Sequence, residues 1–234
     1  MSRFVECLLA RRRAGYVPVI PDFKRISPAD GPLFSGRNVL RAAEDMERAG
    51  APALSVVTEE KHFGGSLELL SDLVNAVDIP VLRKDFIRTT ADIVETARRG
   101  AAAVLLICSC LDEAALGSLY RDAISYGLEP LVEAHTAEEL QWARNLGATL
   151  VGINNRDIMA LERDGGTVAT TSALAVCKPE NAVLISESGI QSPADVRAAL
   201  AAGADGVLVG TAIWMAEDPV SCYRTLSIAE NTDR

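Results

Sequence analysis

Residues 182–212 read AVLISESGIQSPADVRAALAAGADGVLVGTA, and this stretch decides the fold class. Its two apolar runs, 182–188 and 206–212, are rich in Val, Leu and Ile, which is typical of parallel strands buried on both faces. The segment between the runs predicts a helix, and Gly203 suits the left-handed residue that follows a helix end. A strand, a helix and a second parallel strand form a βαβ unit.

The same pattern recurs along the rest of the chain. Three more predicted helices stop at a Gly-Ala pair before an apolar run, at Gly50, Gly100 and Gly147. Successive pairs are about two strand–helix units apart, so the four pairs predict eight units. Eight units in 234 residues fit a closed (β/α)₈ barrel. The alternative, a doubly wound open sheet, would need a glycine-rich nucleotide turn after its first strand, where this chain has IPDFKRISPADG (20–31).

We expect one domain, because no linker, low-complexity tract or charge block divides the chain. It would comprise a leading helix over residues 1–15, a barrel over 16–228 and a tail over 229–234. Helical patterns such as LRAAEDMERAG (40–50) and TADIVETARRG (90–100) separate the apolar runs. The predicted strands are 16–23, 53–59, 81–86, 102–109, 128–135, 150–157, 182–188 and 206–212.

Composition limits the classes of partner. The formal net charge is −9, whereas nucleic acids and anionic membranes are bound by basic faces, so neither is an expected partner. The longest apolar run, 101–111, is too short to span a bilayer. The five scattered cysteines do not suggest a disulfide framework, and the first fifteen residues do not resemble a signal peptide. We therefore expect a cytoplasmic protein.

Polar residues stand at the carboxyl ends of several predicted strands. Because residues two apart on a strand point to the same side, both members of a pair can face the barrel axis. A single such residue is more often a helix cap or part of a structural ion pair. Several together would be buried charges, which are costly in free energy and therefore need a functional reason. The strand ends meet where barrel active sites lie, which favours a catalytic cluster. Its members are Asp22 with Lys24, Glu133 with His135, Asn154 with Arg156, Lys84 and Glu187.

The last two strands predict an anion site. SESGI (186–190) follows the seventh strand and LVGTA (208–212) belongs to the eighth. Gly189 and Gly210 would let backbone amides approach an anion, and we expect a helix to start after each glycine and add its positive end. Isolated glycines usually mark only turns, but this pair lies where barrels commonly hold a substrate phosphate.

No metal site is expected. Cys108 and Cys110 lack further Cys or His partners at ligand spacing, so a buried thiol is the better interpretation, and His62 and His135 are too few for a histidine site. Trp142 is interpreted as a packing residue on a helix.

Seven segments of the chain carry a resemblance to a known family. They are PDFKRISPADG (21–31), AGAPALSVVTEEKHFGGSLELL (49–70), PVLRKDFI (80–87), LEPLVEAHTAEEL (128–140), VGINNRDI (151–158), ISESGI (185–190) and GADGVLVGTAIW (203–214). The motifs PVLRKDFI, GINNRD and ESGI are specific as a set. In this order, the segments resemble the indole-3-glycerol phosphate synthases of tryptophan biosynthesis, over nearly the whole chain after Val17.

The resemblance implies a lyase that needs no metal or organic cofactor and acts on a small phosphosugar. The family closes 1-(2-carboxyphenylamino)-1-deoxyribulose 5-phosphate to indole-3-glycerol phosphate, with loss of carbon dioxide and water. It implies that Lys84 is the general acid of ring closure and that Glu133 is the acid/base of dehydration. Lys24 would hold the anthranilate carboxylate and could also donate a proton. We expect burial and neighbouring cations to lower the pKa of Lys84.

The resemblance also assigns the binding residues. It implies that Asn154 and Arg156 position the carboxylate and the ring, and that Glu187 holds the ribulose hydroxyls. It places Phe63 and Phe86 around the aryl ring, and it matches Ser27, Ser188, Gly189, Gly210 and Thr211 to the phosphate site.

Two residues depart from the family pattern. Asp22, a candidate catalytic carboxylate, stands where the family has Glu, and Asp30 replaces a lysine of the following loop. One alternative function is another phosphosugar barrel enzyme, such as phosphoribosyl-anthranilate isomerase, whose Cys/Asp pair has no match because the first strand has no cysteine. Another is a non-catalytic phosphosugar-binding relative, which would not need both Lys84 and Glu133.

Overall fold

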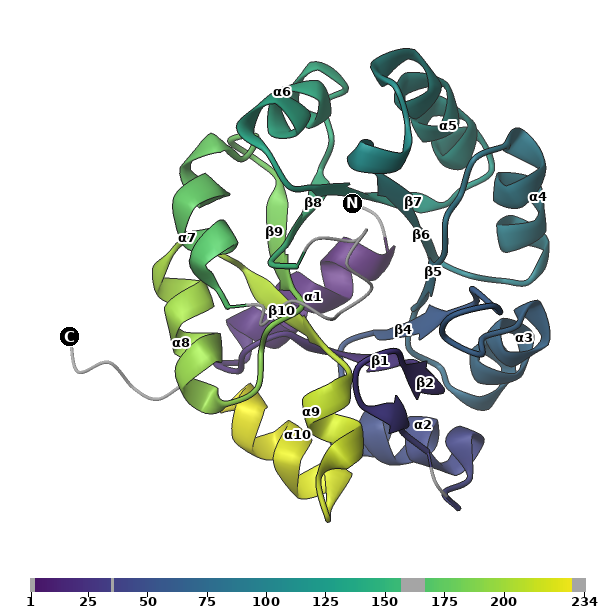
Figure 1. The fold of residues 1–234 in the computed structure, drawn as a ribbon, viewed down its shortest axis with the longest axis vertical. Helices are drawn as coiled ribbons and strands as arrows, with labels where there is room; N and C mark the ends of the chain where they lie inside the picture. The colour runs from purple at the N-terminus through teal and green to yellow at the C-terminus, as the bar shows by residue number, and fades with distance from the viewer. Residues whose placement is uncertain (1–2, 35, 157–166, 229–234) are drawn as a thin grey trace.

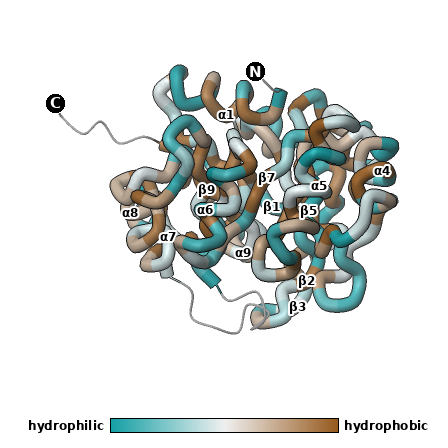
Figure 2. The backbone as a smooth tube through the Cα atoms, turned by 90° about the horizontal axis from the view of Figure 1, so that it is seen from above, coloured by the Kyte–Doolittle hydropathy of each residue, from teal (hydrophilic) through white to brown (hydrophobic). Residues whose placement is uncertain are grey.

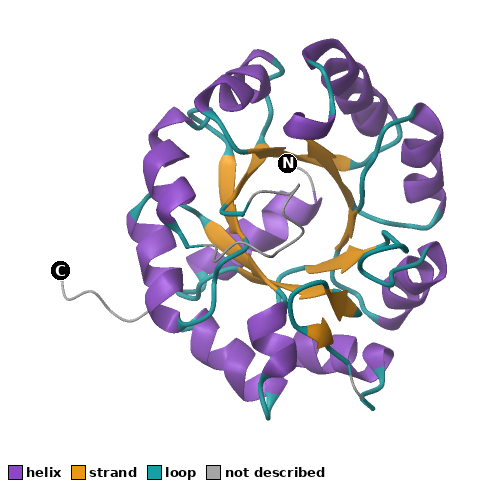
Figure 3. Cartoon of the chain, in the orientation of Figure 1, coloured by secondary structure: helices purple, strands orange, loops and turns teal. Residues whose placement is uncertain are grey.

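The computed structural model describes residues 3–34, 36–156 and 167–228, and its centre is a ring of eight parallel strands (Figures 1 and 3). The ring closes where β1 pairs with β4, with Asp22 opposite Ser55. The predicted (β/α)₈ barrel is thus confirmed over the open sheet. The barrel strands are β1 Val19–Phe23, β4 Leu54–Val57, β5 Val81–Lys84, β6 Ala103–Ile107, β7 Glu129–Ala134, β8 Leu150–Asn154, β9 Val183–Glu187 and β10 Gly206–Val209.

Helices surround the ring on its outer side (Figure 3). A short antiparallel hairpin of β2 Ile26–Ser27 and β3 Gly31–Pro32 lies in the loop after β1. The helices are α1 Arg3–Arg13, α2 Val39–Arg48, α3 Leu67–Ala76, α4 Thr90–Arg98, α5 Glu113–Ser125, α6 Ala137–Asn145, α7 Ala169–Leu174, α8 Pro193–Ala201, α9 Thr211–Met215 and α10 Pro219–Ser227, with 3₁₀ turns η1 Cys108–Cys110 and η3 Ala175–Cys177.

The four glycines that set the repeat have the backbone conformation expected of them. Gly50, Gly100, Gly147 and Gly203 have φ angles of 95°, 80°, 67° and 108°. A side chain is strained in this left-handed region, so glycine is favoured where the chain leaves a helix and turns back into the barrel.

The predicted strands extend past the observed carboxyl ends everywhere except in β1. Polar residues there leave the sheet to begin the loops: Cys108 starts a 3₁₀ turn, and Ser188 has a φ of 64°, outside the strand region. At the other end, β1 starts at Val19, while Tyr16 forms only an isolated bridge with Ile228. Asp157, the predicted end of the sixth strand, lies outside the described residues.

The leading helix seals one end of the barrel. Figure 2 shows α1 at one end and the β2–β3 hairpin at the other. Phe4 and Leu8 of α1 pack into the inner apolar cluster of the barrel. The carboxylate of Glu129, the first residue of β7, accepts hydrogen bonds from the backbone N–H groups of Phe4 and Val5. The amino-terminal end of the barrel is therefore filled, and the opposite end remains for a site.

The predicted tail, 229–234, lies outside the described residues, and the one-domain division stays a prediction. Among the described helices, none is long and apolar enough to cross a membrane.

Candidate active site

Two adjoining cavities open at the carboxyl ends of the barrel strands, and they share Asp22, Lys24, Lys84, Arg156 and Ser188. The first is mainly apolar and the second mainly polar, so the shared charged residues mark the junction. The residues of the apolar wall are Val57, Phe63, Phe86, Leu105 and Ile107. The polar wall includes Asp30, Gly189, Gln191, Gly210 and Thr211.

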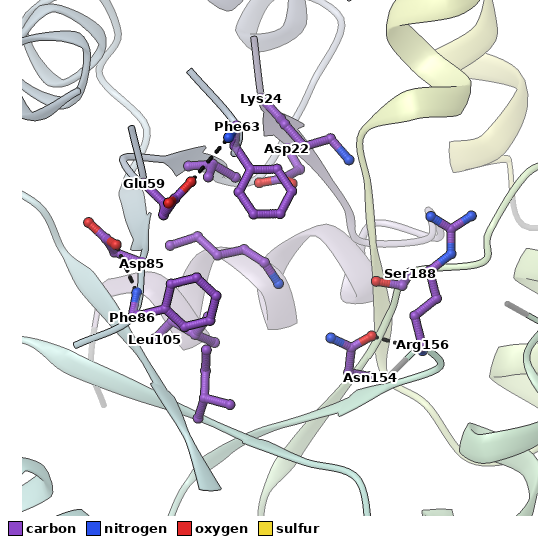
Figure 4. A pocket seen from close by; sticks show the side chains of 13 residues that line it. Asp22, Lys24, Glu59, Phe63, Asp85, Phe86, Leu105, Asn154, Arg156 and Ser188 are labelled. Carbon is purple, nitrogen blue, oxygen red and sulfur yellow. Dashed lines mark hydrogen bonds between the residues drawn. The ribbon is translucent and has the colours of Figure 1, made fainter. Parts of the chain in front are cut away.

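Two phenylalanine rings stand on one side of the apolar cavity, opposite Asn154, Arg156 and Ser188 (Figure 4). The loop that carries Phe63 is fixed by Glu59, whose Oε2 accepts the N–H of Phe63 at 3.1 Å (Figure 4). The loop that carries Phe86 is fixed by Asp85, whose Oδ1 accepts the Phe86 N–H at 2.8 Å. Phe63 and Phe86 thus both lie on the wall of this cavity, and their role at an aryl ring stays a prediction.

Sequence reasoning missed Glu59, Leu105 and Ile107. Leu105 and Ile107 lie two apart on β6 and belong with Ala103 to the inner apolar cluster. Alternation along this strand would have identified them, because residues two apart share a face. Glu59 accepts hydrogen bonds from backbone N–H groups, so no pattern of side chains in the sequence identifies it.

The junction contains a lysine between two carboxylates. Lys84 Nζ lies 2.6 Å from Glu187 Oε2 and 3.3 Å from Glu133 Oε2, and both glutamates are fully buried. Their carboxylates therefore lie deeper in the barrel than the lysine, which itself lines both cavities. On the opposite side, the Arg156 N–H donates to Asn154 Oδ1 at 3.0 Å (Figure 4).

Asp22 is buried at the junction and lines both cavities. Its Oδ1 accepts a hydrogen bond of 2.6 Å from the hydroxyl of Ser55 on β4. The strand-end side chains of β1, β5, β7, β8 and β9 thus converge as predicted.

The polar cavity has the predicted glycines on its wall. Ser188 and Gly189 have φ angles of 64° and 71°, and Gly210 ends β10 just before α9. The Lys24 ammonium donates to Thr211 Oγ1 at 3.4 Å. These observations place four of the five predicted phosphate residues along one wall.

The helix expected after Gly189 is present, but it does not begin directly at the glycine. Helix α8 starts only at Pro193, where Ser192 and Asp195 form a capping box. The N–H groups of Gln191 and Ser192 donate to the Asp195 carboxylate, so the helix supplies its own anion.

Ser27, the fifth predicted phosphate residue, lies behind the polar wall and is 1 % exposed. Its hydroxyl donates to Asp30 Oδ2 at 2.9 Å, and the Asp30 N–H donates back to Ser27 Oγ at 3.2 Å. Asp30, rather than Ser27, faces the cavity. The phosphate role of Ser27 stays a prediction.

A cavity with an apolar and a polar half at the carboxyl end of a (β/α)₈ barrel fits an aryl phosphosugar. Residues 1–226 match the family model described as indole-3-glycerol phosphate synthase. The chain belongs to the indole-3-glycerol phosphate synthase family. This family consists of carbon–carbon lyases of tryptophan biosynthesis, so the resemblance drawn from the motifs is confirmed.

Several curated relatives carry the family name. The indole-3-glycerol phosphate synthase of Pyrococcus furiosus is 42 % identical over 94 % of this chain and 96 % of its own length. That of Thermococcus kodakarensis is 43 % identical, over 93 % and 95 %. Indole-3-glycerol phosphate synthase 1 of Streptomyces coelicolor is 42 % identical, over 94 % of this chain and 81 % of its own length.

The expected lowering of the Lys84 pKa is wrong for this member of the synthase family. Burial disfavours the charged ammonium, but Glu187, Glu133 and Asp22 outweigh it and hold the pKa of Lys84 above its ordinary value. Carboxylates, and not cations, are the partners of this lysine.

The two glutamates shift in opposite directions. Burial would raise the pKa of Glu133, but Lys84 and His135 outweigh it and lower this pKa below the ordinary value. Burial raises the pKa of Glu187 to about 7, because the charge of Glu133 adds to the effect and Lys84 only partly offsets it. One lysine therefore keeps one of the two carboxylates ionised, and the other takes up a proton near neutral pH.

This arrangement predicts a pH-dependent stability that resides in Glu187. Between about pH 4.5 and 7, folded Glu187 holds a proton that the unfolded chain has released, so the free energy of unfolding falls as the pH rises through this window. Glu187→Gln removes this ionisation. Between pH 5 and 8, we expect the free energy of unfolding of the wild type to fall by up to about 3 kcal/mol more than that of the variant.

Denaturant unfolding at pH 5 and pH 8 measures the difference. Glu180→Gln, at an exposed glutamate, is the matched control and should keep the pH dependence of the wild type. Identical pH dependence in Glu187→Gln would show that Glu187 ionises normally.

The remaining candidates, Cys108 and Trp142, are packing residues. Cys108 is buried, and burial raises the pKa of its thiol, as expected for a packed cysteine. Trp142 packs against the outer core. Within 3–34, 36–156 and 167–228, His, Cys, Asp and Glu form no group of three that could hold a metal ion.

Proposed function

We propose that this chain catalyses the reaction of its family, the conversion of 1-(2-carboxyphenylamino)-1-deoxyribulose 5-phosphate to indole-3-glycerol phosphate with loss of carbon dioxide and water. The observation that carries this proposal is the two-part cavity with Lys84 at its junction. The apolar half suits the aryl ring and the glycine-lined half suits the phosphate, so the ribulose carbonyl would lie beside the lysine.

The aryl end of the substrate would bind between Phe63 and Phe86. The anthranilate carboxylate needs a cation, and Lys24 Nζ lies 5.9 Å from the centre of the Phe63 ring. Arg156 and Asn154 lie across the cavity from the rings and would orient the carboxylate and the aryl ring (Figure 4). The phosphate would bind along Ser188, Gly189, Gly210 and Thr211, with Ser27 close behind.

Ring closure forms a bond between the aryl carbon that bears the carboxylate and the ribulose carbonyl carbon, while the carbonyl oxygen gains a proton. We assign this proton to Lys84. Its contact with Glu187 keeps the proton on the nitrogen, so release requires that this contact weaken. Ribulose hydroxyls that bind Glu187 would do this and would bring the lysine pKa down when the substrate is in place.

Loss of carbon dioxide then restores the aromatic ring, and loss of water completes the indole. The new hydroxyl takes up a proton and leaves as water as its C–O bond breaks, while the adjacent ring CH₂ group loses a proton to form the carbon–carbon double bond of the indole. Glu133 would act as the acid/base of this step, since it lies 3.3 Å from Lys84 Nζ on the other side from Glu187. Asp22 would add a third carboxylate near the ammonium group of Lys84.

Asp30 is expected to weaken phosphate binding, because its carboxylate faces the cavity that would receive a dianion. Asp30→Asn removes this charge and should tighten the binding of inorganic phosphate by about three- to tenfold, with a similar fall in KM. Isothermal titration with phosphate measures the effect. Asp72→Asn, at an exposed aspartate on α3, is the control and should leave the affinity unchanged. Unchanged or weaker binding in Asp30→Asn would mean that the phosphate binds elsewhere.

The direct test is turnover of the purified protein without added metal, followed by the fluorescence of the indole product. We expect product to accumulate over many turnovers. Tight binding of the substrate without any product, at high protein concentration, would instead favour a non-catalytic phosphosugar-binding relative.

We infer that α1 and the barrel act as one domain, since α1 packs into the inner core of the barrel. We also place the reaction in the cytoplasm, where a small, highly charged phosphosugar would be available as substrate.

A further inference from the structure

His135 lies just beyond β7, between a carboxylate of the proposed active site and one of helix α6. Its Nε2 is 3.7 Å from Glu133 Oε1, and its Nδ1 is 3.8 Å from Glu139 Oε2. Both distances exceed a hydrogen bond. Within the described residues, both ring nitrogens and Glu133 Oε1 are buried without a hydrogen-bond partner. Buried polar atoms of this kind are rare and carry a free-energy penalty, so three of them around one contact need an explanation.

The two carboxylates differ in how they are held. Glu139 Oε2 accepts the N–H groups of His135 and Thr136 in the capping box of α6, so this carboxylate is fixed. Glu133 contacts Lys84 through Oε2, while its Oε1 lies 3.7 Å from the imidazole Nε2 and makes no hydrogen bond within the described residues. The imidazole thus lies between the fixed carboxylate of Glu139 and Glu133 Oε1, where it can restrict the position of that oxygen.

We propose that His135 is a positioning residue for Glu133, whose imidazole hydrogen-bonds Glu133 Oε1 during the acid/base step while its other nitrogen stays directed at Glu139. This inference rests on the proposed function. A ring movement of about 1 Å closes the gap to hydrogen-bond distance, and catalytic hydrogen bonds are often long before the substrate binds.

An imidazole suits a group that gains and loses a proton. When Glu133 is ionised, Nε2–H can donate to Oε1, and when Glu133 is protonated, its O–H can donate to a bare Nε2. His135 therefore serves both states of Glu133, while the catalytic proton stays on the glutamate or the substrate.

Within the part of the chain that the structure describes, the ring lies between Glu133 on β7 and Glu139 on α6, with Lys84 of β5 on the other oxygen of Glu133 and Cys108 of η1 near both carboxylates. Burial, together with Glu139 and Glu133, raises the pKa of the Cys108 thiol, which therefore stays neutral near pH 7. Among the described residues, Glu133 and Glu139 are the carboxylates at ion-pair distance from the imidazole, and Glu133 links the ring to Lys84 and to the proposed chemistry.

Two substitutions test the proposal. His135→Leu removes both ring nitrogens, and we expect kcat to fall about tenfold or more, KM to change less than about twofold, and the pH dependence of kcat to shift. His135→Gln keeps a donor and an acceptor, and should recover most of the lost rate. Gln141→Leu is the matched control, since it places the same leucine on α6 at an exposed position and should leave all three quantities unchanged.

A double variant separates positioning from a structural role. In a Glu133→Gln background, His135→Leu should cause no further loss of kcat, because His135 acts through that carboxylate. The same loss in both backgrounds would overturn the proposal, as would a wild-type rate and pH profile in His135→Leu. Thermal unfolding of each variant distinguishes misfolding from the expected effect.

A wild-type protein that forms no indole would overturn the proposed function instead. His135 can then be followed by nuclear magnetic resonance of its ring nitrogens. We expect Glu133→Gln to change the ring-nitrogen chemical shifts of His135 and to leave those of His62 in place. Unchanged chemical shifts for both histidines would contradict the contact itself.

Discussion

Lys84→Met is expected to lower kcat by at least about 10³-fold while it weakens ligand binding by less than about tenfold. Methionine keeps an unbranched apolar stem in the space of the lysine but has no proton to give to the carbonyl oxygen. Without the ammonium, Glu133 and Glu187 face each other unpaired, so Glu187 should hold its proton more tightly and the barrel should still fold. The rate is measured by indole fluorescence, and binding by titration with the phosphate-bearing product.

The control is Lys61→Met, at an exposed lysine, which should keep the wild-type rate and affinity. Equal losses of kcat and of binding in Lys84→Met would contradict the assignment of the proton, because a lysine that only anchors the substrate affects both alike.

Gly152→Ala is expected to lower kcat/KM by about 10²-fold and to destabilise the protein by about 1–3 kcal/mol. Gly152 lies on β8, beside β9, and a Cβ there would lie 1.9 Å from Glu187 Oε1 and 3.1 Å from its carboxyl carbon. The added methyl group would push the Glu187 carboxylate away from Lys84. Steady-state kinetics and denaturant unfolding measure the two effects.

Gly117→Ala on α5 is the matched control. The same methyl group there would lie 3.3 Å from the guanidinium of Arg121, which can move, and alanine is the better helix former. We expect unchanged activity and a slightly higher stability. A fully active Gly152→Ala would show that the place of Glu187 beside Lys84 is not needed for catalysis.

The fold follows from short-range rules, which is why the sequence predicts it well. Gly50, Gly100, Gly147 and Gly203 each end a helix in the left-handed region, and the apolar runs between them need cover on both faces. The convergence of Asp22, Lys84, Glu133 and Asn154 then follows from the barrel itself, since all strands end at the same face.

What the sequence could not predict depends on side-chain contacts across strands. The pKa of Lys84 rises because Glu187 reaches it from β9 over Gly152, and this contact depends on rotamers that no motif specifies. Asp30 accepts a hydrogen bond from the Ser27 hydroxyl within a local turn, and this contact also depends on side-chain rotamers. The distances around His135 appear only when β7 and α6 are both in place.

The most direct test of the central claim is a single-turnover reaction with excess protein and substrate labelled with ¹³C at the anthranilate carboxyl group. We expect one labelled carbon dioxide to be released for each indole ring formed by the wild-type protein, and neither product from Lys84→Met. Labelled carbon dioxide without indole, or a substrate recovered intact from the wild-type protein, would contradict the claim that this cavity closes the ring.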